Sequence, residues 1–154
     1  MGFLTGKTAI ITGAGRAVLK DGSCGSIGYG IATAYAKEGA NLVITGRNVK
    51  KLEAAKQELE SLYGIKVLTV QADVCAGGDN EATVANVVKQ AVDTFGGIQV
   101  LINNAQASAS GVPLAEHTTE QFDLAIYSGL YAAFYYMKAC YPLSLIHISE
   151  PTRH

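Results

Sequence analysis

Apolar residues follow two alternating patterns along this chain. Four short runs are almost continuously apolar and rich in β-branched residues. They are Thr8–Thr12, Asn41–Thr45, Lys66–Gln71 and Gln99–Asn103. Runs of this length and composition predict strands of a parallel sheet that is covered on both faces.

Stretches with helical spacing follow each of these runs. Their apolar positions are Ile27, Ile31, Ala34 and Tyr35; then Leu52, Ala55, Leu59 and Leu62; then Val84, Val87, Val88, Ala91 and Phe95; and finally Phe122, Ile126, Leu130, Phe134 and Met137. Gly39, Gly64 and Gly96 stand where the first three stretches end, as helix-terminating glycines do. Strand and helix therefore alternate four times, which predicts an α/β fold with a doubly wound parallel sheet.

Composition excludes several classes of partner. The 154 residues are 49% hydrophobic and 16% charged, with a net charge of −1, as expected for one globular domain. A near-neutral chain gives no sign of nucleic-acid or anionic-membrane binding. The three cysteines and three histidines form no metal-binding spacing, so no metal is expected. Without a leader or an apolar span, we expect a cytoplasmic protein with no membrane contact.

Glycines cluster after the first predicted strand. Gly13 and Gly15 follow the strand, and Gly28 lies at the start of the first helix. Glycine lets the backbone approach a pyrophosphate, and the amides and dipole of a helix N-terminus attract its negative charge. This position between a strand and a helix predicts a phosphate-binding loop.

Four segments together carry a family resemblance. TGAGR followed by SIGYGIATAYAKEGANLVITGRN, then QADV, then VLINNA, resembles the N-terminal half of the short-chain dehydrogenase/reductase superfamily over residues 5–142. The resemblance implies a Rossmann-type sheet of strand order 3-2-1-4, cut after the fourth helix. It also implies binding of NAD(H) or NADP(H), and hydride transfer to or from a carbonyl or alcohol carbon.

The cofactor residues of that family map onto three places in this chain. The family's pyrophosphate-binding turn corresponds to Thr12, Gly13, Ser26, Ile27 and Gly28. Its adenine-contacting residues correspond to Asp73 and Val74, and its segment under the nicotinamide-side ribose corresponds to Asn103 and Ala105. The asparagine of this last motif is expected to brace the sheet.

Arg47 bears on the choice of cofactor. A carboxylate at the end of the second strand suits the ribose 2′-hydroxyl of NAD, whereas an arginine suits the 2′-phosphate of NADP. Here Thr45-Gly46-Arg47 offers no acid and one guanidinium. Arg47 therefore favours NADP(H), the other interpretation being a solvated arginine at a helix start.

Several positions depart from the family pattern. The glycine loop is nine residues longer than usual, and SIGYGIA also resembles the enoyl-thioester reductase branch. Gln106 stands in place of a glycine, and Gly129 stands where an asparagine often helps to hold a proton-relay water. Tyr127, Tyr131 and Tyr135 lie on one side of the fourth helix, where the family dimerises, although ordinary half-buried surface explains them equally. The parent protein is expected to be a homo-oligomer through this helix.

The catalytic residues of the family have no counterpart here. The chain contains no Tyr-x-x-x-Lys pair, so no catalytic residue is assigned and the chain alone is expected to be inactive. It is interpreted as the NADP(H)-binding half of a reductase acting on a ketone or 3-oxoacyl thioester. The alternatives are a non-catalytic NADP(H)-binding sensor, or a parent similar to enoyl-thioester reductases.

The end of the chain lacks both hydrophobic patterns. LSLIHISEPTR and the final His154 resemble the in-frame translation of a sequencing-library adapter. We therefore expect a binding domain over residues 1–142 and a non-native tail over residues 143–154, and His147 and Ser149 are given no catalytic role.

Overall fold

A computed structural model describes residues 2–75 and 80–145 of the chain. Its centre is a four-stranded parallel sheet of order β3-β2-β1-β4, which confirms the predicted fold class and strand order. The strands are β1 (Thr8–Thr12), β2 (Asn41–Gly46), β3 (Val67–Gln71) and β4 (Val100–Ile102).

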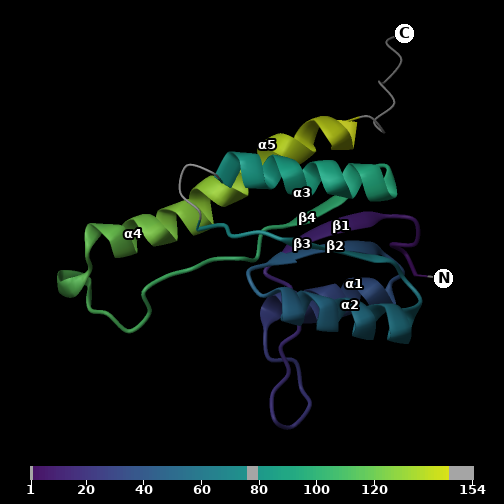
Figure 1. The fold of residues 1–154 in the computed structure, drawn as a ribbon, viewed down its shortest axis with the longest axis horizontal. Helices are drawn as coiled ribbons and strands as arrows, with labels where there is room; N and C mark the ends of the chain where they lie inside the picture. The colour runs from purple at the N-terminus through teal and green to yellow at the C-terminus, as the bar shows by residue number, and fades with distance from the viewer. Residues whose placement is uncertain (1, 76–79, 146–154) are drawn as a thin grey trace.

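Helices cover both faces of this sheet (Figure 1). α1 (Ile27–Lys37) and α2 (Val49–Tyr63) pack on one face, while α3 (Asn80–Phe95) and α5 (Ala132–Leu145) pack on the other. Alternate residues of each strand serve the two layers: in β1, Ile11 packs towards α1 and α2, and Ile10 packs towards α3 and α5. This two-sided burial explains why the strand sequences are continuously apolar.

α1 buries a different set of residues from the one that the apolar pattern predicts. Its buried residues are Gly28, Tyr29, Ala32 and Ala36. Ile27, by contrast, is 77% exposed. Gly28, Ala32 and Ala36 let the helix lie close to the sheet, and Tyr29 is the large side chain buried beside them. In α2 and α3 most of the expected positions are buried, although Leu62 is exposed.

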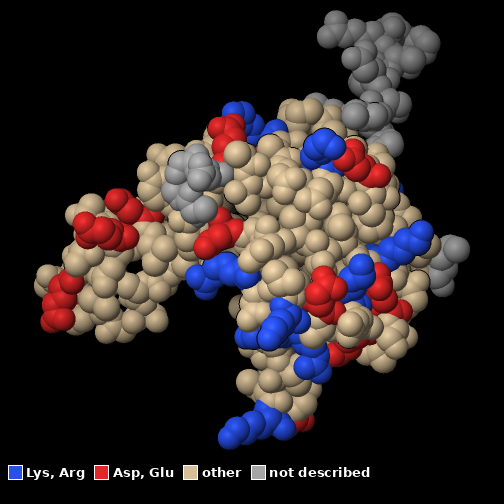
Figure 2. Space-filling model, in the orientation of Figure 1, with Lys and Arg blue, Asp and Glu red and all other residues tan. Residues whose placement is uncertain are grey.

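The fourth predicted helix is divided into three parts. α4 (Thr119–Ile126) begins at a capping box of Thr118 and Gln121, and a π-helical turn (Tyr127–Tyr131) joins it to α5. α4 extends away from the sheet, after a loop that contains a short 3-10 turn (Leu114–Glu116). Acidic side chains lie over this end of the molecule (Figure 2).

Most of the expected apolar stripe of the fourth helix faces outward. Its exposed members are Phe122, Leu130, Phe134 and Met137. The residues that α5 buries against the sheet are instead Ala132, Tyr136 and Cys140. The face that carries Phe122, Leu130, Phe134 and Met137 is therefore free of the sheet and accessible to another surface.

α5 reaches Leu145 with Pro142 inside it, so residues 143–145 of the predicted tail are helical. The remainder of that tail, including His147 and Ser149, lies outside the described residues, and the boundary at 142 stays a prediction. Within residues 2–75 and 80–145, every helix is too short or too polar to cross a bilayer.

Candidate functional site

The loop after β1 passes close to the end of β4. Gly13 has a φ of +71°, in the left-handed region that favours glycine, and its N–H donates to the Thr45 carbonyl at 2.9 Å. A Cβ at Gly13 would lie 3.1 Å from both the Ala105 Cβ and the Asn104 Nδ2. Glycine at this position therefore lets the loop cross between the ends of β2 and β4.

The N-terminus of α1 lies directly beside this turn. Ser26 caps the helix by accepting the Tyr29 N–H at 3.4 Å. A Cβ at Gly28 would overlap the Gly13 carbonyl oxygen, so only glycine permits this approach. The first-turn amides of α1 are thus available at the edge of the sheet for an anion, as a phosphate loop requires.

The extra residues of the glycine loop form an anchored excursion below α1 and α2 (Figure 1). Val18 and Cys24 pair in an isolated antiparallel bridge. Arg16 donates its N–H to the Lys51 carbonyl at 2.8 Å, and its guanidinium forms an ion pair with Glu58. Hydrogen bonds from Tyr29 and from Arg16 lower the pKa of the Glu58 carboxyl. The insertion is therefore tied to α2 at its first residue.

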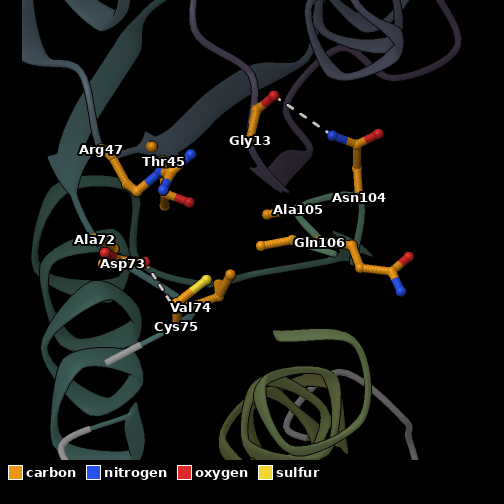
Figure 3. Close-up of a pocket in the computed structure, with 12 residues that line it drawn as sticks. Gly13, Thr45, Arg47, Ala72, Asp73, Val74, Cys75, Asn104, Ala105 and Gln106 are labelled. Carbon is orange, nitrogen blue, oxygen red and sulfur yellow. Dashed lines mark hydrogen bonds between the residues drawn. The ribbon is translucent and has the colours of Figure 1, made fainter. Parts of the chain in front are cut away.

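A cavity of about 210 Å³ opens at the carboxyl ends of the strands (Figure 3). The β2 and β3 ends contribute Arg47, Asp73, Val74 and Cys75, and the β4 end contributes Ala105 and Gln106. The Cys75 N–H donates to Asp73 Oδ1 at 2.9 Å, which orders this turn. Burial, together with the nearby Asp73, raises the pKa of the Cys75 thiol.

A second opening of about 260 Å³ lies between the glycine loop and the start of α2. Its lining includes Gly15, Ser26, Arg47, Asn48 and Lys51. Two cations, the capped N-terminus of α2 and the start of α1 therefore surround one space, a combination suited to a phosphate group.

The asparagine that braces the sheet is Asn104, whereas the sequence indicated Asn103. The Asn104 Nδ2 donates to the Thr12 carbonyl at 2.9 Å, and the Asn104 and Ala105 backbone amides donate to Thr12 Oγ1 at 3.0 and 2.9 Å. Asn103 is exposed and lines a third cavity beside α5. Successive residues point to opposite sides after a strand, so the neighbour of the expected residue makes the contact.

The structure brings most of the expected cofactor residues together. Arg47, Asp73, Val74, Gly13 and Ala105 line the first cavity, Gly15 and Ser26 line the second, and Thr12 and Asn103 line the third. Gly28 supports the turn, whereas the Ile27 side chain points into solvent.

Two lining residues were not singled out from the sequence as cofactor residues. Lys51 lies in the first turn of α2, whereas Arg47 precedes the helix cap Asn48, so helical spacing does not pair the two and only the fold brings them to one opening. Gln106 was noted only as a departure from the family pattern, and only the fold brings it to the cleft.

A profile of the short chain dehydrogenase family matches residues 7–149, which is most of the chain. The chain belongs to this family. The 12α-hydroxysteroid dehydrogenase of a Clostridium species is 61% identical over 142 residues, covering 92% of this chain and 52% of that protein.

Solved structures of the family agree in fold. L-sorbose reductase from Gluconobacter frateurii, in complex with NADPH and L-sorbose, matches with a TM-score of 0.79 and 30% identity, over 95% of this chain and 50% of that one. An alcohol dehydrogenase from Thermococcus sibiricus, in complex with 5-hydroxy-NADP, matches with a TM-score of 0.76 and 29% identity, over 89% and 52% of the two chains. The chain thus spans about half the length of these relatives.

Proposed function

We propose that this chain binds NADP(H), in preference to NAD(H), for an oxidoreductase that interconverts a hydroxysteroid and the corresponding ketosteroid. The observation that carries the cofactor preference is the basic opening beside the glycine loop, where Arg47 and Lys51 flank the capped start of α2. Residues 41–48 contain no Asp or Glu that would bind a free 2′-hydroxyl.

The described residues fit a dinucleotide along its length. In our proposal Arg47 and Lys51 hold the 2′-phosphate, and Asp73 and Val74 border the adenine. The glycine loop and the first-turn amides of α1 receive the pyrophosphate, because Gly13 and Gly28 let the loop and the helix start lie in contact and present their amides together. The nicotinamide riboside then lies past β4, beyond Ala105.

The reaction proposed for the whole protein is hydride transfer. A bound nicotinamide supplies or accepts the hydride, while the alcohol oxygen loses or gains a proton. The hydroxysteroid substrate is suggested by the Clostridium relative at 61% identity. Because this sequence has no Tyr-x-x-x-Lys pair to move that proton, we expect the chain by itself to bind cofactor without turning over substrate.

The test is calorimetric titration of the chain with NADPH and with NADH. Arg47→Ala should weaken NADPH binding by about ten- to a hundredfold, because hydrogen bonds to a charged group are lost, and should change NADH binding less than twofold. Lys50→Ala is the matched control, since it removes an exposed cation from the same helix start. Equal loss of both cofactors in Arg47→Ala would contradict the NADP(H) preference, and no binding of either cofactor would contradict the function itself.

A further inference from the structure

Gln106 is the first side chain past Ala105 at the end of β4, and it borders two cavities. It lines the cleft that contains Arg47 and also the cavity of about 100 Å³ beside α5. Its carboxamide points away from Arg47 and towards the helix below the cleft (Figure 3). The side chain therefore lies at the end of the cleft opposite the basic opening.

Gly129 provides the space that this carboxamide occupies. A Cβ at Gly129 would lie 3.1 Å from Gln106 Nε2 and 3.4 Å from Gln106 Cδ. The φ of Gly129 is not in the left-handed region, so its backbone does not need glycine. Among the described residues, Gln106 is the neighbour that a Cβ at Gly129 would crowd, and the contact joins two residues that are 23 positions apart.

The surrounding turn holds Gln106 in place. Ser128, a buried residue in the π-helical turn, accepts the Ala107 N–H at 2.9 Å, which ties the residue after Gln106 to the helix. π-helical turns inside α-helices frequently occur at functional sites. The hydrogen bond at Ala107 therefore fixes the backbone next to Gln106, and the Gln106 carboxamide lies against Gly129, which has no side chain.

The cavity beside Gln106 has a polar lining. Thr12, Asn103, Asn104 and Gln106 are among its lining residues, and so is the buried Tyr136, whose hydroxyl interacts with the Thr45 side chain. A lining with several polar residues suits a polar group of a ligand.

We propose that Gln106 is a positioning residue that hydrogen-bonds the nicotinamide riboside, and that Gly129, by lacking a side chain, leaves room for the Gln106 carboxamide. A carboxamide offers both N–H donors and a carbonyl acceptor, which match ribose hydroxyls and the nicotinamide amide. Dinucleotides cross a doubly wound sheet where the strand order reverses, here between β1 and β4. With Arg47 on the adenosine half, the nicotinamide half therefore reaches Gln106. This inference rests on the proposed function.

The experiment compares NADPH with 2′-phospho-ADP, which lacks the whole nicotinamide riboside, in calorimetric titrations of the chain. Gln106→Met keeps the length of the side chain and removes its amide. It should weaken NADPH binding about three- to tenfold, the value of one hydrogen bond, and leave 2′-phospho-ADP binding within twofold.

Gly129→Ala tests independently whether the space at Gly129 is needed. Alanine favours a helix over glycine, so we expect this variant to fold, and urea unfolding of the variant without ligand checks that a loss of NADPH binding does not come from unfolding. Its effect should match that of Gln106→Met, and the double variant should show no further loss, because both changes remove the same interaction.

Three results would overturn the inference. They are unchanged NADPH binding in Gln106→Met, equal weakening of both ligands, or additive losses in the double variant. If the parent chain bound neither ligand, the proposed function would fail and this inference with it. If it bound both ligands without regard to Gln106, only this inference would fail.

Discussion

Asn104 and Thr12 show how single side chains join the two halves of the cleft. Thr12 Oγ1 accepts two backbone amides from the segment after β4, and Asn104 returns a side-chain hydrogen bond to the Thr12 carbonyl. Buried hydrogen bonds of this kind contribute about 1 kcal/mol each and place their atoms within narrow limits. These bonds therefore fix the floor of the cleft that we propose for the cofactor.

Cys75 provides a test of where the cofactor binds. Because burial raises its thiol pKa, its alkylation by iodoacetamide should be slow at neutral pH and should accelerate as the pH rises and the thiolate forms. Since Cys75 lines the cleft, NADPH at ten times its dissociation constant should slow this alkylation about tenfold. Mass spectrometry of the labelled peptides gives the rate at each cysteine.

Cys140 is the internal control for that experiment. It is buried on α5, where burial raises the pKa of its thiol to about 11, and its slow labelling should not respond to NADPH. In Arg47→Ala, protection of Cys75 should require more NADPH. Protection of Cys140 alone would place the cofactor elsewhere.

At the scale of elements, the long glycine loop is held against α2 by the interactions of Glu58 with Arg16 and Tyr29. The folded-state pKa of Glu58 is lowered by hydrogen bonds from Tyr29 and Arg16. The stabilisation is therefore present above the pKa of the unfolded chain and is lost as the pH falls through the folded value. Both charged side chains are partly exposed, so the contribution stays below about 1 kcal/mol.

Glu58→Gln should remove the pH dependence that this carboxylate gives to the free energy of unfolding. At pH 7 the variant should be less stable than the parent by up to about 1 kcal/mol, and the difference should close as the pH drops below about 4. Urea unfolding at a series of pH values measures it. Glu116→Gln, at an exposed carboxylate of the short 3-10 turn, is the control, and a Glu58→Gln difference that grew on acidification would contradict the assignment.

Helix existence could be predicted from periodicity, but helix orientation could not. The stripes of α2 and α3 are buried largely as expected, because their apolar side chains are the large ones. In α1 the inner face combines Tyr29 with Gly28, Ala32 and Ala36, and such small residues have little weight in a hydrophobicity pattern. The π-helical turn that divides the fourth predicted helix has no such pattern at all, since it depends on contacts with the loop after β4.

At the scale of the whole molecule, the outward face of α4 and α5 remains to be explained. Phe134 and Met137 are 51% and 53% exposed, and Leu130 lies beside them on the same side. Exposed apolar groups in one patch usually mark an interaction surface. We propose that this surface joins two copies of the chain.

Phe134→Glu tests that proposal. The parent chain should sediment as a dimer at micromolar concentration, and the variant should shift to the monomer, because a charge would be buried without a partner. Leu62→Glu changes an equally exposed apolar residue on α2, in the opposite layer, and should leave the dimer intact. A monomeric parent chain, or equal dissociation by both variants, would count against the surface.

The sequence by itself determined the alternation of strands and helices, the glycine loop and the family, and the resemblance to that family implied the 3-2-1-4 sheet. The alternation follows from local periodicity, and the loop and the resemblance follow from motifs contained within a few residues. Only the tertiary structure decided that Asn104 rather than Asn103 braces β1, that Lys51 joins Arg47 at one opening, and that Gln106 rests on Gly129. Such contacts depend on which side chains the packed sheet brings within a few ångströms, and no spacing along the chain encodes that directly.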